Sequence, residues 1–365
     1  MTLVNERLGS QETGLLRVGD VQVLSDEVAH DRKGHEYTVR RVRVGDESDA
    51  NPELKTLYKN QGDQFEQMLK DHKEWPATTV EDGVVNVSEN NIPAQWLYVN
   101  ADGSPTQVQE WASHFPTAIA LEPLQRLEEG GKWLKAGGPD EKSLELFTNM
   151  VDAIGLRSRA RIYEKQITGY AERSGVDKLE IISLGSGAAV PNIQATEKLE
   201  EIGKAAHWKF FDFNPNALMF AQQLVAEKGF NFSTFDYGPE RFNEVSGNLE
   251  PTGRFYQRAY ETPDESVDIV DALGLWEYLK PKEAQQFAKK LFEKVKPGGS
   301  MIVSNMLPSR PQRELNQRAV GWPGLYLRSD TDLLDIVTTA GIDSKNVTMT
   351  HAEDGVYVVM EIQKP

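Results

Sequence analysis

The rhythm of hydrophobic and polar positions changes near residue 179. Beyond it, short apolar runs alternate with amphipathic segments of helical period; the runs are 179–184, 208–212, 231–235, 267–273 and 300–305. Pro215 stands where the first turn of a helix tolerates proline, and Gly229 ends the same segment. Strands and helices that alternate in this way predict an α/β fold, a doubly wound parallel sheet with helices on both faces.

The end of the chain departs from this rhythm. After a helical segment at about 330–340, two β-rich runs at 346–351 and 356–363 flank Asp354-Gly355, a strong hairpin signal. The sequence therefore predicts an antiparallel hairpin that closes the parallel sheet.

The first 143 residues follow another pattern. Residues 21–23 and 37–44 alternate like the strands of a hairpin, and residues 53–73 have a helical period. A further helix at about 144–174 leads into the first strand of the sheet. We expect an N-terminal α+β region at 1–143, acting as an accessory or lid, followed by a doubly wound domain at 144–365.

Composition narrows the range of functions. The chain has 365 residues, a formal net charge of −16 and no cysteine. Its acidity argues against nucleic-acid binding and a polybasic membrane anchor, and the absence of cysteine excludes disulfides and thiolate zinc sites. No apolar run approaches the roughly 20 residues of a membrane span, the start lacks a signal peptide, and the histidines show no metal-ligand spacing. We expect a cytoplasmic protein with no metal, no nucleic acid and no membrane among its partners.

A glycine turn follows the first strand of the predicted sheet. Gly185, Ser186 and Gly187 interrupt the apolar run before a helix, and glycine lets the backbone approach a ligand. Asp212 ends the next strand, where an acidic side chain can bind ribose hydroxyls. The alternatives are an ordinary strand-to-helix turn and an aspartate that caps the helix opening at Asn214. Together the two features favour a nucleotide site.

Four motifs occur in order along this half of the chain. They are Gly185-Ser186-Gly187, Phe211-Asp212-Phe213-Asn214-Pro215, Leu275-Trp276-Glu277-Tyr278-Leu279 after the strand that contains Asp268-Ile269-Val270, and Lys296-Pro297-Gly298-Gly299. With them, residues of about 155–365 resemble the class I S-adenosylmethionine-dependent methyltransferases. The resemblance implies a Rossmann-like, mostly parallel seven-stranded sheet whose last two strands come from the C-terminal hairpin.

Two positions depart from the pattern of that family. Ser183 stands where an acidic residue is usual, two positions before the first glycine, and Ala189 stands where a third glycine is common. The first change removes a contact implied for the amino group of the cofactor, and the second places a methyl group near the turn. Cofactor binding is still expected.

The resemblance implies S-adenosyl-L-methionine as the cofactor. The residues implied to contact it are Gly185, Ser186, Gly187, Asp212, Phe213, Asp236, Tyr237, Asp271 and Tyr163. Two of these have a plain alternative: Asp236 as a solvated loop aspartate, and Tyr163 as part of a solvated, charged helix face with Arg157, Arg159 and Arg161.

Two residues beyond the fourth strand are candidates for catalysis. Glu277 and Tyr278 lie where the carboxyl end of the sheet opens towards substrate. A positioned carboxylate helps methyl transfer when the acceptor still carries a proton. Glu277 is the first candidate for substrate contact or base, and its alternative is helix capping or a polar role in the core.

A basic segment follows the fifth strand. It contains four arginines and one glutamate between residues 305 and 328, in a chain that is strongly acidic. An arginine fork can orient a carboxylate or phosphate, or the segment is a solvated loop paired with acidic neighbours. The candidate substrate-binding residues are Asn305, Arg310, Trp322, Tyr326 and Arg328.

These features predict methyl transfer from S-adenosyl-L-methionine to a small molecule, carboxylate-bearing or otherwise anionic. One alternative is a nicotinamide-dependent oxidoreductase, against which the terminal hairpin and the missing third glycine count. Another is a non-catalytic protein that keeps the fold for binding or scaffolding. We expect a small-molecule partner and allow for a homo-oligomer.

Overall fold

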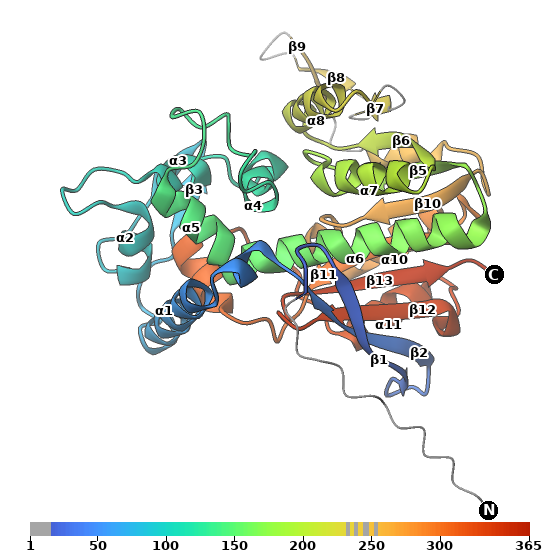
Figure 1. Ribbon diagram of the computed structural model, residues 1–365, viewed down its shortest axis with the longest axis horizontal. Helices are drawn as coiled ribbons and strands as arrows, with labels where there is room; N and C mark the ends of the chain where they lie inside the picture. The colour runs from blue at the N-terminus through green and yellow to red at the C-terminus, as the bar shows by residue number, and fades with distance from the viewer. Residues whose placement is uncertain (1–15, 231–233, 237–239, 244–247, 252–254) are drawn as a thin grey trace, which may run out of the picture.

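Nine strands form one sheet, and its central part confirms the predicted fold class. The computed structural model describes residues 16–365 apart from 231–233, 237–239, 244–247 and 252–254. The strands lie in the order β1 (Val21–His30), β2 (Glu36–Val44), β12 (Val347–Ala352), β13 (Tyr357–Gln363), β11 (Val295–Met306), β10 (Val267–Ala272), β5 (Lys178–Leu184), β6 (Ala205–Phe211) and β7 (Thr234–Asp236) (Figure 1).

We number the strands of the sheet from β7 to β12 by their order along the chain, starting with β5 as the first. Across the sheet from β7 to β12, they then stand as third, second, first, fourth, fifth, seventh and sixth. The five strands from β7 to β11 are parallel to one another. Strand β13 is antiparallel to both β11 and β12. This is the mostly parallel sheet with a C-terminal hairpin that the sequence implied. Of the predicted third strand, residues 231–233 lie outside the described residues.

Helices cover both faces of the sheet because its central strands are apolar on both sides. Every residue of β10 is buried, as expected for a parallel strand between two helix layers. Apolar side chains of α6 (Val151–Ser174), α7 (Val190–Glu201) and α8 (Pro215–Glu227) pack on one face. Those of α9 (Tyr256–Tyr260), α10 (Pro281–Phe292) and α11 (Asp330–Thr339) pack on the other.

The predicted N-terminal hairpin is present, and it extends the main sheet. Strands β1 and β2 are antiparallel, and β2 pairs in parallel with β12. The sheet therefore crosses the boundary that we placed after residue 143. Two small hairpins lie outside it: β3 (Thr79–Glu81) with β4 (Val84–Asn86), and β8 (Glu240–Asn243) with β9 (Asn248–Pro251).

A helical cap stands at the carboxyl ends of the parallel strands (Figure 1). It has its own apolar core around Trp111 and Phe147, which also takes in Leu315 and Val320 from the segment after β11. We call residues 52–150 and 307–327 the cap. Its helical elements are α1 (Pro52–Asp71), α2 (Ile92–Tyr98), α3 (Gln107–Ala112), η2 (Ala118–Leu121), α4 (Glu122–Gln125), α5 (Glu141–Asn149) and η4 (Leu315–Val320). Short helical turns η1 (Glu47–Ala50), η3 (Trp276–Tyr278) and η5 (Ser344–Asn346) lie outside it.

Candidate active site

The glycine turn lies where β5 ends and α7 begins. Gly185 and Gly187 have φ of +61° and +54°, a left-handed conformation that glycine adopts without steric cost. The amide of Gly185 donates to the carbonyl of Phe211 at 2.8 Å, so the turn rests on the end of β6. Within the described residues, the Ser186 hydroxyl is buried without a hydrogen-bond partner. Such an orphaned group in a turn of this kind fits a ligand.

Asp212 closes the glycine turn from the end of β6. Its carboxylate accepts hydrogen bonds from the amides of Gly187 at 2.8 Å and Asn214 at 2.9 Å. Burial raises the pKa of Asp212, while backbone amides, including those of Asn214, Gly187 and Phe213, oppose the shift. The geometry therefore assigns Asp212 at least the structural role of joining the turn to the start of α8.

A buried polar network lies beneath the turn. The carboxylate of Asp271, at the end of β10, accepts from the Tyr163 hydroxyl at 2.5 Å, the Ser183 hydroxyl at 2.8 Å and the Asn192 amide at 3.2 Å. Burial raises the pKa of Asp271 to about 7, against these three hydrogen bonds. Ser183 and Asp271 are opposite one another in register. The neighbouring strand thus supplies the carboxylate that the sequence lacks at position 183.

The alternative of a solvated helix face around Tyr163 is wrong. Tyr163, Arg157 and Arg159 are all buried, because α6 is covered by the sheet, by α7 and by the cap. Arg157 holds the carboxylate of Asp46 at 2.7 Å and donates to carbonyls of the cap, including that of Leu124 at 2.9 Å. Arg157 and Arg159 are therefore interior groups of the protein.

A small cavity borders the glycine turn, and the cap forms one wall of it. It encloses about 70 Å³, and Ala118, Leu121 and Gln125 of the cap face Asp271 and the turn. A Cβ built on Gly187 would lie 2.2 Å from the Cβ of Ala118. The first turn of the cap's η2–α4 segment, residues 118–125, thus packs directly onto the glycine turn. We call this space the turn cavity.

A second cavity of about 40 Å³ contains the two candidate catalytic residues. Glu277 is buried, and among the described residues its Oε2 has no hydrogen-bond partner. Burial raises the pKa of Glu277 to about 7, although Arg159 and Arg328 oppose the shift. The nearest cation is Arg159, whose Nη1 lies 4.0 Å from Oε1 of Glu277. Tyr278 lines the same space, which we call the acceptor cavity.

The two cavities adjoin each other. Arg159, Gly274 and Leu121 line both of them. Gly274 contributes no side chain to this junction, and a Cβ built there would lie 3.9 Å from the Arg159 guanidinium. A ligand at the glycine turn and a ligand beside Glu277 would therefore be neighbours.

The predicted substrate arginines have partners within the protein. Arg328 donates to the carbonyls of Trp276 at 2.6 Å and Leu279 and to Oδ1 of Asn305 at 3.0 Å. Arg310 forms a buried ion pair with Asp152 at 2.5 Å. These contacts fix the segments after β10 and β11, so neither guanidinium is free to orient a separate anion.

The predicted aromatic contacts of the substrate are divided between two positions. Trp322 lines the acceptor cavity and donates through its indole nitrogen to the Tyr278 hydroxyl at 3.2 Å. Tyr326 is partly exposed and lies against Arg328, with the guanidinium 5.4 Å from the ring centre. The structure brings Trp322 to the cavity and places Tyr326 outside its lining.

Phe213 and Asp236, two further implied cofactor residues, are not part of the turn-cavity wall. Phe213 is exposed and faces Phe255, with ring centres 6.4 Å apart. Asp236 ends β7 in register with Phe211. Tyr237 lies outside the described residues. Of this group, Phe213 and Asp236 are placed near the ends of β6 and β7, where the sheet continues from Asp212.

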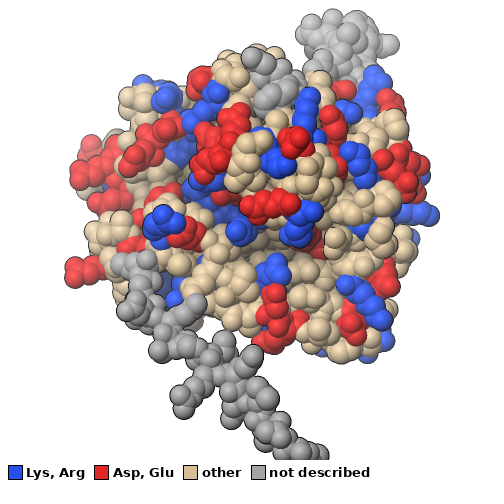
Figure 2. Space-filling view, turned by 45° about the vertical axis from the view of Figure 1, so that its right-hand side comes forward, with Lys and Arg blue, Asp and Glu red and all other residues tan. Residues whose placement is uncertain are grey.

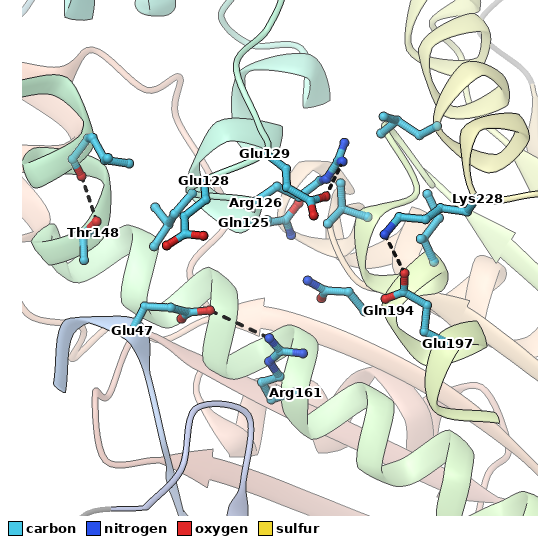
Figure 3. Close-up of a pocket in the computed structure, with 15 residues that line it drawn as sticks. Glu47, Gln125, Arg126, Glu128, Glu129, Thr148, Arg161, Gln194, Glu197 and Lys228 are labelled. Atoms are coloured by element: carbon cyan, nitrogen blue, oxygen red, sulfur yellow. Dashed lines mark hydrogen bonds and ion pairs between the residues drawn. The ribbon is translucent and has the colours of Figure 1, made fainter. Parts of the chain in front are cut away.

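A larger cleft of about 540 Å³ lies between the cap and helices α6 to α8 (Figure 3). It shares Gln125 and Val190 with the turn cavity. Charged side chains of both signs line it, and several pair with each other, as Lys228 does with Glu197 at 2.8 Å. The face of the molecule in Figure 2 likewise shows acidic and basic groups interspersed.

The sequence reasoning missed two residues of the site. They are Arg159, which the sequence suggested only as part of a solvated helix face, and Asn192, which no motif singled out. Helix α6 carries Arg157, Arg159 and Arg161 at every second position, and this spacing spreads the arginines around the helix. That spread could have indicated that at least one of them points inward.

The comparisons with known proteins give the chain no family, and a solved structure with a TM-score above 0.5 shares its fold. No family model matches the chain, and no curated protein matches it. A possible exported protein from Bordetella parapertussis shares 13% identity over 73% of this chain and 90% of its own, with a TM-score of 0.53. Magnesium protoporphyrin IX methyltransferase from Synechocystis, with bound S-adenosylmethionine, has 14% identity and a TM-score of 0.43, over 73% of this chain and all of its own. The N-methyltransferase NodS from Bradyrhizobium japonicum has 13% identity and a TM-score of 0.36, over 57% and 97%. The TM-scores of these two methyltransferases are too low to support an assignment of function. Strand order and the position of the glycine turn give this chain the fold of the class I S-adenosylmethionine-dependent methyltransferases.

Proposed function

We propose that this protein transfers a methyl group from S-adenosyl-L-methionine to a small-molecule acceptor. The observation that supports this most directly is the junction of the two cavities, where Arg159, Gly274 and Leu121 form shared walls. In an open parallel sheet, ligands bind outside the carboxyl ends of the strands. A cofactor at the turn and an acceptor beside Glu277 would meet there.

The residues at the glycine turn fit this cofactor in their chemistry. The Ser186 hydroxyl is buried without a partner, and Asp271 presents a carboxylate to the turn cavity. We propose that Gly185, Gly187 and the carboxylates of Asp212 and Asp271 contact the cofactor. When bound, the cofactor supplies a methyl group on a sulfonium, and the chemical driving force is its own. The protein has to orient the acceptor and exclude water.

The volume of the turn cavity sets a condition on this proposal. About 70 Å³ is far below the roughly 300–1,000 Å³ typical of a small-molecule site. The cleft of about 540 Å³ shares two wall residues with it, and Ala118 of the cap packs against the glycine turn. We therefore propose that residues 118–125 move outward when the cofactor binds.

We assign the acceptor contact to Glu277. A buried carboxylate with one unpartnered oxygen can accept the proton that an acceptor hydroxyl or amine loses during transfer. Tyr278 and Trp322 supply aromatic surface beside it. A carboxylate-bearing or otherwise anionic acceptor stays part of the proposal, although Arg310 and Arg328 are engaged elsewhere.

The alternatives differ in the ligand that they require. The antiparallel strand β13 between β11 and β12 does not favour a nicotinamide-dependent oxidoreductase. A scaffold protein would bind neither cofactor. Isothermal titration of S-adenosylmethionine, S-adenosylhomocysteine and NAD into the full chain separates these cases. We expect heat from the first two only; heat from NAD alone, or from none, would refute the proposal.

The location of the protein and its partners other than the acceptor are expected from the sequence. No helix among the described residues is long and apolar enough to cross a membrane. The cytoplasmic location, the absence of nucleic acid among the partners and a homo-oligomeric state stay predictions.

A further inference from the structure

Two residues of the acceptor-cavity wall each have a buried polar atom without a hydrogen-bond partner. Within the described residues, these are Oε2 of Glu277 and Nε of Arg159. Both residues line this cavity, and both are more than nine-tenths buried. A buried polar group without a hydrogen bond destabilises the folded protein, so each such group needs an explanation.

Two contacts fix the Arg159 guanidinium. Its Nη1 donates to the carbonyl of Leu273 at 2.6 Å, and the group lies 4.7 Å from the ring centre of Tyr357. With these contacts in place, Nη1 of Arg159 lies 4.0 Å from Oε1 of Glu277. At this distance the two groups form no direct hydrogen bond.

The rest of the cavity wall is mainly apolar and aromatic. It includes Trp111, Trp322, Leu121 and Tyr357. A guanidinium and a carboxylate in such surroundings select a ligand strongly, because each loses water on burial and each needs a partner.

We infer that Arg159 and Glu277 together recognise the acceptor. This acceptor is a compact molecule that presents a hydroxyl or amine beside a carboxylate or carbonyl oxygen. Its O–H or N–H donates to Oε2 of Glu277, and its oxygen accepts from Nε of Arg159. This inference rests on the proposed function and supplies the anion-binding group that Arg310 and Arg328 do not.

The size of the acceptor cavity limits what enters without a change in the wall. About 40 Å³ holds the polar end of such a molecule, and Leu121 and Leu124 of the η2–α4 segment form the apolar boundary beyond it. The body of the acceptor therefore takes the space that this segment leaves when it moves.

Three matched probes test this inference on the full chain saturated with S-adenosylhomocysteine. Mandelate has adjacent hydroxyl and carboxylate groups, phenylacetate lacks the hydroxyl, and benzyl alcohol lacks the carboxylate. We expect titration calorimetry to show mandelate binding at least tenfold more tightly than either of the others, since a hydrogen bond to a charged group is worth about 1.5–3 kcal/mol.

Variants separate the two contacts. Glu277→Leu should remove the higher affinity of mandelate relative to phenylacetate. Arg159→Lys should remove its higher affinity relative to benzyl alcohol. Arg173→Lys is the control, because its side chain lies on the exposed part of the same helix. A thermal melt of each variant checks that it folds.

The outcomes are distinguishable from failure of the proposed function. If S-adenosylhomocysteine does not bind the wild type, the proposed function fails first. If it binds, and mandelate is not preferred or does not bind, this inference is overturned. It is also overturned if Arg159→Lys weakens only S-adenosylhomocysteine, because Arg159 would then hold the cofactor's own carboxylate.

Discussion

Asp271 and Glu277 are buried carboxylates on the two sides of one junction, and their surroundings differ. Burial raises the pKa of each to about 7. Asp271 accepts hydrogen bonds from Tyr163, Ser183 and Asn192, whereas Oε2 of Glu277 accepts none among the described residues. Both carboxylates are therefore shielded from water. The one on the cofactor side has its hydrogen bonds filled, and the one on the acceptor side has an oxygen without a partner.

This difference separates a supporting role from a reactive one. A satisfied buried network makes its region rigid, as a glycine turn that holds a cofactor requires. A buried carboxylate with a free oxygen and a pKa near 7 has the properties of a general base. We expect changes at Asp271 to act on stability and cofactor affinity, and changes at Glu277 to act on the acceptor and the rate.

The largest expected effect is on the rate in Glu277→Gln. Losing a general base costs roughly 10²–10⁴-fold in turnover, and glutamine fills the same space. Affinity for S-adenosylhomocysteine should stay unchanged. Initial rates with any acceptor that the wild type methylates would test this, with Glu200→Gln on the exposed face of α7 as control. A variant that keeps the wild-type rate removes Glu277 from catalysis.

The next effect is on folding in Asp271→Ala. The change leaves the hydroxyls of Tyr163 and Ser183 without their acceptor, at about 1–3 kcal/mol of unfolding free energy. Urea denaturation measures it. Asp335→Ala is the matched control, because the exposed ion pair of Asp335 with Lys33 is worth about 0–1 kcal/mol. Equal losses in the two variants would show that the network adds no stability.

The raised pKa of Glu277 also predicts how the unfolding free energy depends on pH. Burial lifts the pKa of Glu277 from 4.5 to about 7, so between these values the folded protein binds a proton that the unfolded chain has lost. This contribution to the unfolding free energy is therefore present below pH 4.5 and is lost as pH rises towards 7. In Glu277→Gln, the unfolding free energy should fall less over this window than in the wild type. Parallel curves for the two proteins would contradict the raised pKa.

The smallest effect concerns the missing third glycine. Ala189 has φ of +55°, and its methyl group is strained in this left-handed conformation. Ala189→Gly should raise the unfolding free energy by about 0.5–1 kcal/mol, after the entropic cost of glycine. Thermal melts of the two proteins compare them. A lower melting temperature for the variant would mean that the methyl group packs favourably.

The sequence predicted the sheet well because its signals are local. The apolar runs, the glycine turn and Asp354-Gly355 each determine a short element, and the order of these elements determines the sheet. It did not predict that β2 pairs with β12, since this contact joins residues about 300 positions apart in the chain and leaves no local pattern.

The candidate site was predicted unevenly for the same reason. Gly185, Gly187 and Asp212 lie together at the ends of adjacent strands, as their spacing indicated. The sequence predicts Arg310 and Arg328 as substrate-binding residues because it does not show their partners within the protein. These partners are Asp152 for Arg310 and the carbonyl of Trp276 for Arg328. Arg159 was overlooked because its surroundings come from the cap, β10 and β13.

Titration of S-adenosylhomocysteine into the wild type, Asp271→Asn and Glu277→Gln tests the division of roles most directly. The wild type and Glu277→Gln should bind with the same affinity, and Asp271→Asn should bind at least tenfold more weakly, because asparagine cannot accept from all three donors. The account is contradicted if the wild type does not bind, or if Glu277→Gln loses affinity while Asp271→Asn keeps it.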